Sequence, residues 1–245
     1  MTDLRHGLDA LVERHGLPAG SSDRLGALLD LLGADPHAPT TVHTPARALD
    51  VHLADSLVAL ELPVVWAATA IADLGAGAGF PGLPLAIALP QASVALVEST
   101  ARKCAFIEVA AAAANVINAR AVAERAESWE AGRGAHDLVT ARALAPLAVI
   151  AEYAAPLLRP DGVLVAWKGR RDALEERDAA AAAEQLGLAL EEVRPVEPYA
   201  GADHRHLHVL RKVAPTPTRF PRRPGMARKR PLAAENQPTS DRLHS

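Results

Sequence analysis

From about residue 64 to residue 213, short apolar segments typical of β-strands alternate with alanine-rich segments typical of helices. This alternation constrains the fold strongly, because strands joined by helical crossovers form a parallel sheet with right-handed connections. No helical segment separates the last two strands, which are therefore expected to form an antiparallel hairpin at one sheet edge. The expected strands are 64–74, 93–98, 117–123, 137–140, 162–167, 188–196 and 206–213, and the expected helices are 81–89, 102–114, 144–158 and 172–186.

The segments on either side of this region have different patterns. Leucines at helical spacing predict three helices in the first 60 residues, the third over 47–60. The last 32 residues contain six prolines and are expected to be extended or disordered. The sequence thus predicts a helical cap over 1–62, a sheet-containing core over 63–213 and a basic, flexible tail over 214–245.

Composition excludes several classes of protein. The chain has 245 residues, of which 49% are hydrophobic, which is typical of a globular protein. Its one cysteine, Cys104, has no partner for an internal disulfide, and no Cys/His set has zinc-finger spacing. The first residues lack an apolar signal core, and the uncharged stretch 74–97 contains four glycines and three prolines. We expect a soluble, cytoplasmic, monomeric protein with neither a structural metal nor a membrane span.

Charge is distributed unevenly along the chain. The net charge is −3, but residues 1–210 carry 17 basic and 27 acidic side chains. Residues 211–231 carry eight basic side chains and no acidic one. An acidic body followed by a basic segment is typical of proteins that contact a polyanion. On charge alone, a solvated tail with no specific role is equally compatible with this pattern.

The most informative segment is Asp73-Leu-Gly75-Ala-Gly77-Ala-Gly79, which follows the first expected strand. Glycines let the backbone turn tightly and let a ligand approach it closely. Open α/β sheets bind ligands at the carboxyl ends of their strands, where this loop lies. Glu98 ends the second expected strand, and a carboxylate there can accept hydrogen bonds from both hydroxyls of a ribose.

Two cofactors fit this loop. Gly77-Ala-Gly-Phe-Pro-Gly82 matches the dinucleotide pattern G-x-G-x-x-G. The longer pattern of an acid, a spacer and three alternating glycines fits S-adenosylmethionine. The charge of Asp73 favours the second reading, because an anion repels a pyrophosphate but suits the ammonium and sulfonium groups. A glycine-rich turn that binds no ligand is the third alternative.

The segment 73–85, D-L-G-A-G-A-G-F-P-G-L-P-L, resembles the signature of the ribosomal small-subunit methyltransferase G family. The resemblance covers about residues 40–232, and F-P-G after the loop is its most specific element. Further segments resemble family motifs in the same order, namely His52-Leu-Ala-Asp55-Ser56-Leu57, Glu98-Ser99 with Arg102-Lys103, Thr140-Ala-Arg142 with Trp167-Lys168-Gly169, Arg205-His206-Leu207, and the basic stretch from Phe220 to Leu232.

The resemblance implies a Rossmann-like class I methyltransferase that uses S-adenosylmethionine. Its implied substrate is N7 of a guanine in the 530 loop of 16S rRNA, in the small ribosomal subunit. Guanine N7 has a free lone pair, so the reaction needs no prior deprotonation and can depend mainly on in-line positioning. The sequence agrees, because it lacks the N/D-P-P-Y/F and Pro-Cys motifs of other acceptor chemistries. The rival functions are an NAD-dependent oxidoreductase and a non-catalytic RNA-binding assembly factor.

Candidate residues follow from the loop pattern and the resemblance. The cofactor-binding candidates are Asp73, Gly75, Gly77, Gly79, Phe80, Glu98, Ser99, Ala126, Glu127 and Arg142. No residue is assigned as catalytic, with Arg142 as the one candidate. The RNA-binding candidates are Lys103, Lys168, Arg219, Arg222, Arg223, Arg228, Lys229 and Arg230.

Several polar residues have a structural alternative. Arg142 can equally form an ion pair at a helix end, and Asp55 and Ser56 can serve helix packing. The sequence does not distinguish a core position from a site position for His52. The alternating histidines at 204, 206 and 208 could chelate a metal, but Asp203 is the only carboxylate near them in the sequence, so no metal is expected. Cys104 is expected in the core.

Overall fold

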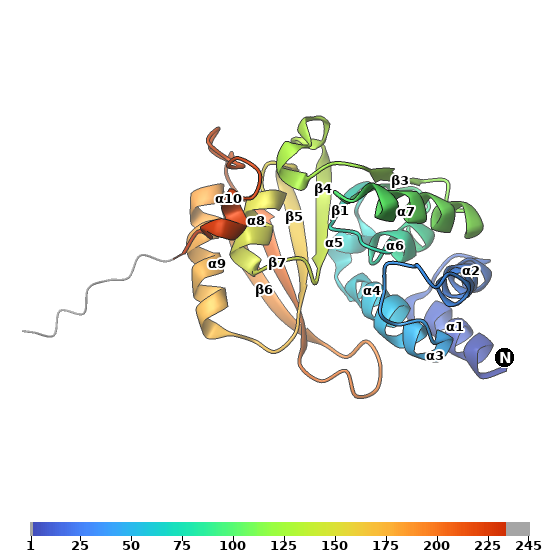
Figure 1. Ribbon diagram of the computed structural model, residues 1–245. Helices are drawn as coiled ribbons and strands as arrows, with labels where there is room; N and C mark the ends of the chain where they lie inside the picture. Colours follow the sequence, from blue (N-terminus) through green and yellow to red (C-terminus); the bar gives the residue numbers. More distant parts are fainter. Residues whose placement is uncertain (1, 234–245) are drawn as a thin grey trace, which may run out of the picture.

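The computed structural model describes residues 2–233 and contains a seven-stranded sheet with the order β3-β2-β1-β4-β5-β7-β6 (Figure 1). The strands from β1 to β5 pair in parallel, and β7 runs antiparallel to both β5 and β6. The strands are β1 (Ala70–Leu74), β2 (Ser93–Val97), β3 (Ala119–Val122), β4 (His136–Arg142), β5 (Leu158–Lys168), β6 (Leu188–Val196) and β7 (Arg205–Lys212). The predicted mostly parallel sheet with an antiparallel hairpin at its edge is confirmed.

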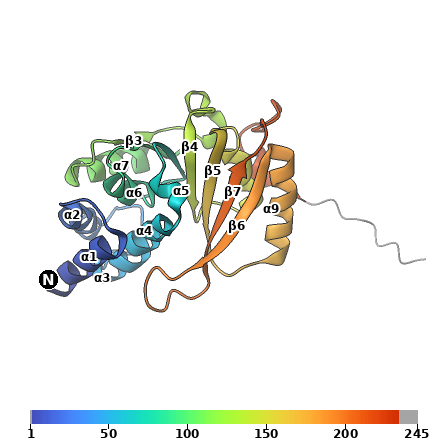
Figure 2. The same ribbon diagram turned by 180° about the vertical axis from the view of Figure 1, so that it is seen from behind.

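Helices cover both faces of the sheet (Figures 1 and 2). Alternate residues of each strand point to opposite faces, so Ile71 enters one hydrophobic core and Ala72 enters the other. The first core includes the N-terminal helices with α6 (Gly82–Ala88) and α7 (Ala101–Ala113). The second includes α8 (Leu147–Ala154) and α9 (Ala173–Leu186). No helix among residues 2–233 is long and apolar enough to cross a membrane.

The N-terminal helices pack on the first face. They are α1 (Thr2–His15), α2 (Ser21–Ala34), α3 (Pro45–Ala48), α4 (Asp55–Leu57) and α5 (Pro63–Trp66). The single helix expected over 47–60 is instead divided by a π-helical turn (Leu49–Ala54) and a 3₁₀ turn (Val58–Glu61). The expected strand start at Val64 is wrong, because Pro63 occupies the first position of α5 and the strand begins at Ala70.

The C-terminal segment differs most from its sequence-based expectation. Residues 214–233 do not extend away from the body. They pack on the second face, where α10 (Met226–Lys229) lies beside α8 (Figure 1). Phe220 and Ala227 belong to the second core and are 5% and 2% exposed. The apolar side chains at these two positions provide the burial that holds the segment in place. The rest of the expected flexible tail, 234–245, lies outside the described residues.

Candidate active site

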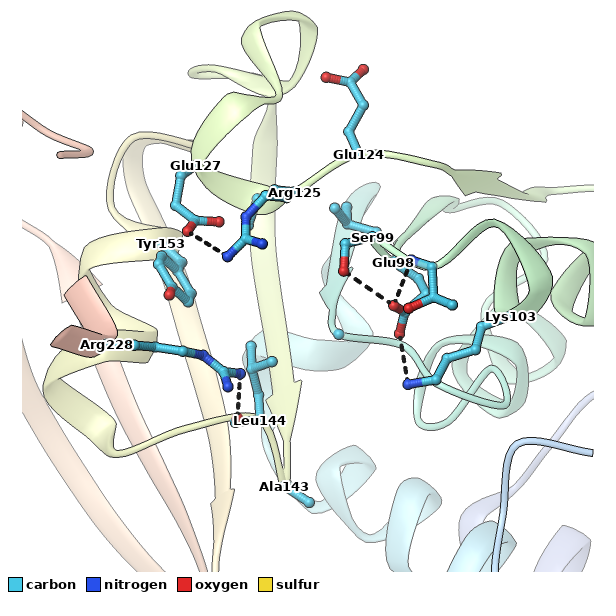
Figure 3. A pocket seen from close by; sticks show the side chains of 14 residues that line it. Glu98, Ser99, Lys103, Glu124, Arg125, Glu127, Ala143, Leu144, Tyr153 and Arg228 are labelled. Atoms are coloured by element: carbon cyan, nitrogen blue, oxygen red, sulfur yellow. Dashed lines mark hydrogen bonds and ion pairs between the residues drawn. The ribbon is translucent and has the colours of Figure 1, made fainter. Parts of the chain in front are cut away.

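A cavity of about 370 Å³ opens at the carboxyl ends of β1, β2, β3 and β4 (Figure 3). These four strands end in the loops that supply nearly all of its lining, as expected for an open parallel sheet. Two lining residues come from elsewhere, Tyr153 from α8 and Arg228 from α10. The lining residues are Gly75, Val97, Glu98, Ser99, Thr100, Lys103, Glu124, Arg125, Ala126, Glu127, Ala143, Leu144, Tyr153 and Arg228.

The glycine loop is fastened to the end of β2. The N–H groups of Gly75 and Ala76 both donate to the Val97 carbonyl, at 2.8 and 3.3 Å. The N–H of Gly77 donates to Oε2 of Glu98 at 3.3 Å. Gly77 has a φ of +59°, in the left-handed region that non-glycine residues avoid. The loop therefore curls around the Glu98 carboxylate.

Asp73 is a buried residue that links the residues on either side of the glycine loop. Its carboxylate accepts hydrogen bonds from the Gly82 N–H and the Thr140 hydroxyl, each at 2.9 Å. The side chain is fully buried, and burial raises the pKa of Asp73 to about 7. A Cβ at Gly82 would lie 2.9 Å from the same carboxylate, so glycine is needed for this approach. Asp73 is not among the lining residues of the cavity and both of its carboxylate oxygens are bound within the protein, so the structure lends no support to the sequence argument that its charge faces the cofactor.

Glu98 lies at one end of the cavity with Ser99 and Lys103 (Figure 3). Its Oε1 accepts from the Thr100 N–H at 2.9 Å, and the Lys103 ammonium lies 3.6 Å from Oε2. Burial opposes ionisation, but these donors and the Gly77 N–H outweigh it and lower the pKa of Glu98. The cavity thus has an ionised carboxylate fixed in orientation before any ligand arrives.

Glu127 lies at the opposite end, with Arg125, Tyr153 and Arg228 around it (Figure 3). It is 8% exposed, and its Oε1 accepts from the Gly225 N–H at 3.0 Å. The Arg125 guanidinium lies 3.5 Å from the same oxygen. The two ends of the cavity therefore each present one oriented carboxylate.

Comparison with known proteins decides the family. A family model described as rRNA small subunit methyltransferase G matches residues 34–206. A ribosomal RNA small subunit methyltransferase G from Synechococcus sp. (strain JA-2-3B'a(2-13)) is 39% identical over 207 residues, which cover 81% of this chain and 80% of that protein. One from Rubrobacter xylanophilus is 41% identical over 77% of this chain and 74% of its own length.

The chain belongs to the rRNA small subunit methyltransferase G family. The family resemblance of the sequence motifs is thereby confirmed, and the protein is a methyltransferase by family and fold.

Solved structures agree on the fold. Fibrillarin from Methanococcus jannaschii, a pre-rRNA processing protein, superimposes with a TM-score of 0.51 at 15% identity, over 62% of this chain and 70% of that one. The [4+2]-cyclase SpnF gives a TM-score of 0.54 at 16% identity, over 82% and 98%. This is the Rossmann-like class I methyltransferase fold. The fold alone does not specify a reaction, and the argument for function rests on the family and the site.

Five of the cofactor candidates line the cavity, namely Gly75, Glu98, Ser99, Ala126 and Glu127. The other five, Asp73, Gly77, Gly79, Phe80 and Arg142, are not among its lining residues. Sequence reasoning missed seven lining residues, which are Val97, Thr100, Glu124, Arg125, Ala143, Leu144 and Tyr153. The first four flank predicted candidates, and Ala143 follows a strand end, so the rule that ligands bind at strand ends could have found them. Tyr153 has no such signal.

The family motif around Asp55 joins the N-terminal helices to the sheet. Arg142 donates to Oδ2 of Asp55 at 2.9 Å and to the Val51 carbonyl at 3.0 Å. The Arg205 guanidinium lies 3.5 Å from Oδ1 of the same carboxylate. The hydroxyl of Ser56 donates to the carbonyl of His52. This geometry favours the ion-pair and packing interpretations of Arg142, Asp55 and Ser56.

His52 bridges the N-terminal helices and the glycine loop. Its ring stacks on Phe80 with a centroid separation of 4.8 Å, and Nε2 lies 2.9 Å from the Thr40 hydroxyl. Burial lowers the pKa of His52 to about 4, so the ring is neutral at physiological pH. His52 supports the loop and does not line the cavity.

The RNA candidates divide into two sets. Lys103 and Arg228 line the cavity, Lys168 is 2.5 Å from Glu175, and Arg222 pairs with Glu152, so these four are engaged within the protein. The second set is Arg219, Arg223, Lys229 and Arg230, which are exposed, as Arg228 is, but do not line the cavity. Within residues 2–233 none of this second set forms an ion pair, although Arg219 stacks 5.0 Å over the Phe220 ring.

Neither the histidine row nor the cysteine forms a reactive centre. In the part of the chain that the structure describes, no group of three His, Cys, Asp or Glu side chains could hold a metal. His206 instead lies 2.9 Å from the Gly169 carbonyl, and His208 lies 3.3 Å from Glu176. Cys104 is buried in α7, as expected, and its thiol donates to the Glu98 carbonyl.

Proposed function

We propose that the protein transfers a methyl group from S-adenosylmethionine to N7 of a guanine in the 530 loop of 16S rRNA. Family membership supports rRNA of the small subunit as the substrate class. The observation that carries the cofactor assignment is the cavity with Glu98 fixed at one end and Glu127 at the other. The base and the loop come from the family resemblance of the motifs.

The cavity fits the chemistry of an adenosine. Its volume of about 370 Å³ is within the range of small-molecule sites, about 300–1,000 Å³. Glu98 would accept hydrogen bonds from the ribose hydroxyls, because its carboxylate is ionised and the N–H groups of Thr100 and Gly77 fix its orientation. Glu127 would accept from the adenine amino group at the other end. Bound S-adenosylmethionine supplies the electrophilic methyl group.

The loop fits a dinucleotide poorly. A pyrophosphate site offers free backbone N–H groups to the phosphate oxygens. Here the N–H groups of Gly75, Ala76, Gly77 and Gly79 already donate to Val97, Glu98 or Ala76. These hydrogen bonds within the loop, and not the charge of Asp73, disfavour an NAD-dependent oxidoreductase.

The protein's part in the reaction is positioning. Guanine N7 is a nucleophile without losing a proton, so no general base is needed, and none is assigned. In-line alignment of donor and acceptor can supply a large share of the rate enhancement. The contacts of Arg142 with Asp55 and Val51 support a positioning role at the end of β4 in place of a direct role in the reaction.

The exposed basic residues suit the rRNA backbone. Arg219, Arg223, Lys229 and Arg230 lie on the same segment as Arg228, which lines the cavity. Contacts with phosphates would hold the RNA near the methyl donor without reading its sequence. An rRNA substrate supports a cytoplasmic location.

Methyl transfer to small subunits tests the proposal. Subunits from a strain lacking this enzyme are incubated with the purified protein and tritiated S-adenosylmethionine. The labelled fragment of the rRNA is then located, and its nucleosides are separated. We expect one labelled N7-methylguanosine in the 530 loop. Binding to subunits without transfer would favour a non-catalytic assembly factor. Stabilisation against thermal unfolding by NADH and not by S-adenosylhomocysteine would favour the oxidoreductase.

A further inference from the structure

The C-terminal segment 220–232 reaches the cavity from outside the region that matches the family model, which ends at residue 206. It is anchored by Arg222, whose N–H and guanidinium donate to the Glu152 carboxylate at 3.1, 2.8 and 2.5 Å. Glu152 is 1% exposed and the Arg222 side chain is 24% exposed, so a partly exposed guanidinium pairs with a buried carboxylate through charge-assisted hydrogen bonds. The anchor fixes the segment a few residues before it meets the cavity.

Two contacts then join the segment to the adenine end. The N–H of Gly225 donates to Oε1 of Glu127 at 3.0 Å. Nη2 of Arg228 donates to the Leu144 carbonyl at 2.9 Å, in the loop that follows β4 (Figure 3). Gly225 has a φ of +84°, so a residue with a side chain would strain the backbone that presents this N–H. One carboxylate oxygen of Glu127 is thereby held by backbone, and the other remains for a ligand.

We propose that residues 220–228, the C-terminal clasp, form the adenine-side wall of the cofactor cavity, and that Gly225 and Arg228 are positioning residues for cofactor binding. The inference rests on the proposed function in that it takes the ligand of the cavity to be S-adenosylmethionine. It separates Arg222 and Arg228, whose guanidinium groups donate to Glu152 and Leu144, from the exposed basic residues that form no ion pair within residues 2–233. A segment that only bound RNA would not need the Arg222–Glu152 pair or the hydrogen bond from the Gly225 N–H to Glu127.

Neighbouring residues of equal charge give the first test. Both side chains are exposed, but Arg228→Ala removes a guanidinium that lines the cavity, and Lys229→Ala removes a charge that does not line it. We expect Arg228→Ala to weaken binding of S-adenosylhomocysteine, measured by calorimetry, by about tenfold or more. Lys229→Ala should leave it within twofold. Thermal unfolding without ligand checks that both variants fold.

A change in selectivity gives the second test. S-inosylhomocysteine carries a carbonyl oxygen where adenine carries its amino group, so an oriented Glu127 should reject it. Gly225→Ala should lower the preference for S-adenosylhomocysteine by about tenfold, because strain displaces the N–H that holds the carboxylate. Gly201→Ala is the matched control, since Gly201 has a φ of +79°, lies outside the cavity lining and, like Gly225, has open space around it.

The outcomes are distinguishable. Weaker binding in Arg228→Ala together with lost selectivity in Gly225→Ala would support the clasp. If the wild type binds S-adenosylhomocysteine and both variants keep its affinity and selectivity, the proposal about the clasp is wrong and the proposed function still stands. A wild type that binds neither nucleoside would overturn the proposed function as well.

Discussion

The Asp73 carboxylate and the Thr140 hydroxyl form a fully buried hydrogen bond of 2.9 Å between the ends of β1 and β4. The same carboxylate accepts from the N–H of Gly82, the first residue of α6. One side chain therefore ties two strands and the following helix together behind the glycine loop. The cavity depends on this arrangement even though Asp73 does not line it.

Asp73 should make stability depend on pH. Its folded-state pKa of about 7 lies above its ordinary value of 3.8, so its favourable contribution is complete below about pH 4 and is lost as the pH rises through about 7. The free energy of unfolding should fall by about 1.4 kcal/mol per pH unit within that window. Asp73→Asn lacks the titration; its one amide oxygen can accept from the Gly82 N–H while its NH2 group donates to the Thr140 hydroxyl oxygen. Urea unfolding from pH 4.5 to 7.5 should show a steeper fall in the wild type, and parallel curves would contradict the prediction.

Glu98→Ala should weaken cofactor binding by about 1.5–3 kcal/mol, because hydrogen bonds to an ionised carboxylate are lost. The maximal rate at saturating cofactor should fall much less, since Glu98 is assigned to binding. Glu124→Ala is the control, as it removes another carboxylate from the cavity lining. Calorimetry with S-adenosylhomocysteine measures the affinity. Normal affinity with a large loss of turnover would show that the ribose assignment is wrong.

Gly77→Val should abolish measurable cofactor binding. At a φ of +59° a branched side chain strains the backbone by about 1–3 kcal/mol and moves the N–H that contacts Glu98. Gly134→Val introduces the same strain at a φ of +61° in open space, outside the cavity lining. Both variants should lose similar stability, and only Gly77→Val should lose cofactor affinity. Equal affinities in the two folded variants would remove the loop from the site.

Arg222→Ala should destabilise the fold by about 3–5 kcal/mol, because it leaves the buried Glu152 carboxylate without its counter-ion. Arg223→Ala, an exposed neighbour, should change the free energy of unfolding by less than about 0.5 kcal/mol. Removing both partners should cost less than the two single changes added together. Additive effects in urea unfolding would show that the pair is not coupled.

The exposed basic residues should carry much of the salt dependence of RNA binding. Each phosphate contact steepens the plot of log affinity against log salt by about 0.7–0.9. Replacing Arg223, Lys229 and Arg230 together by alanine should flatten this slope for small-subunit binding, leave S-adenosylhomocysteine affinity nearly unchanged and leave the choice of guanine the same. Slopes that coincide with the wild type would favour a solvated segment without an RNA role.

The sheet was predictable from sequence because its signals are local. Runs such as Ser93–Val97 are continuous and apolar, and the periodic helices between them imply parallel pairing. The expected strand over 117–123 has the weakest strand pattern of the seven, because it contains Asn118 and Arg120. The structure explains Asn118, whose amide donates to three carbonyls from Ala86, Leu89 and Ala92 just before the strand begins.

The cavity was only partly predictable, because half of it depends on distant partners. Glu98 and Gly75 could be placed from strand ends and spacing. The direction of the Asp73 carboxylate could not, since an acid at a strand end can face either a ligand or the backbone of the next helix. The role of the C-terminal residues could not be predicted either, because Arg222 and Gly225 donate hydrogen bonds to partners 70 and 98 residues earlier in the chain. The prolines of the C-terminal segment predicted that it would form no long helix, and its helix α10 has only four residues. Proline content carries no information about burial, so the buried positions of Phe220 and Ala227 could not be predicted from it.

The position of the C-terminal clasp has a consequence for synthesis. Translation proceeds from the N-terminus, and β7 ends at Lys212, so a nascent chain possesses every strand before the residues that wall the adenine end have been made. A ligand stabilises only the form that binds it. The cofactor should therefore bind an incomplete chain more weakly than the finished protein, and it should stabilise the fold most once synthesis has passed Arg228.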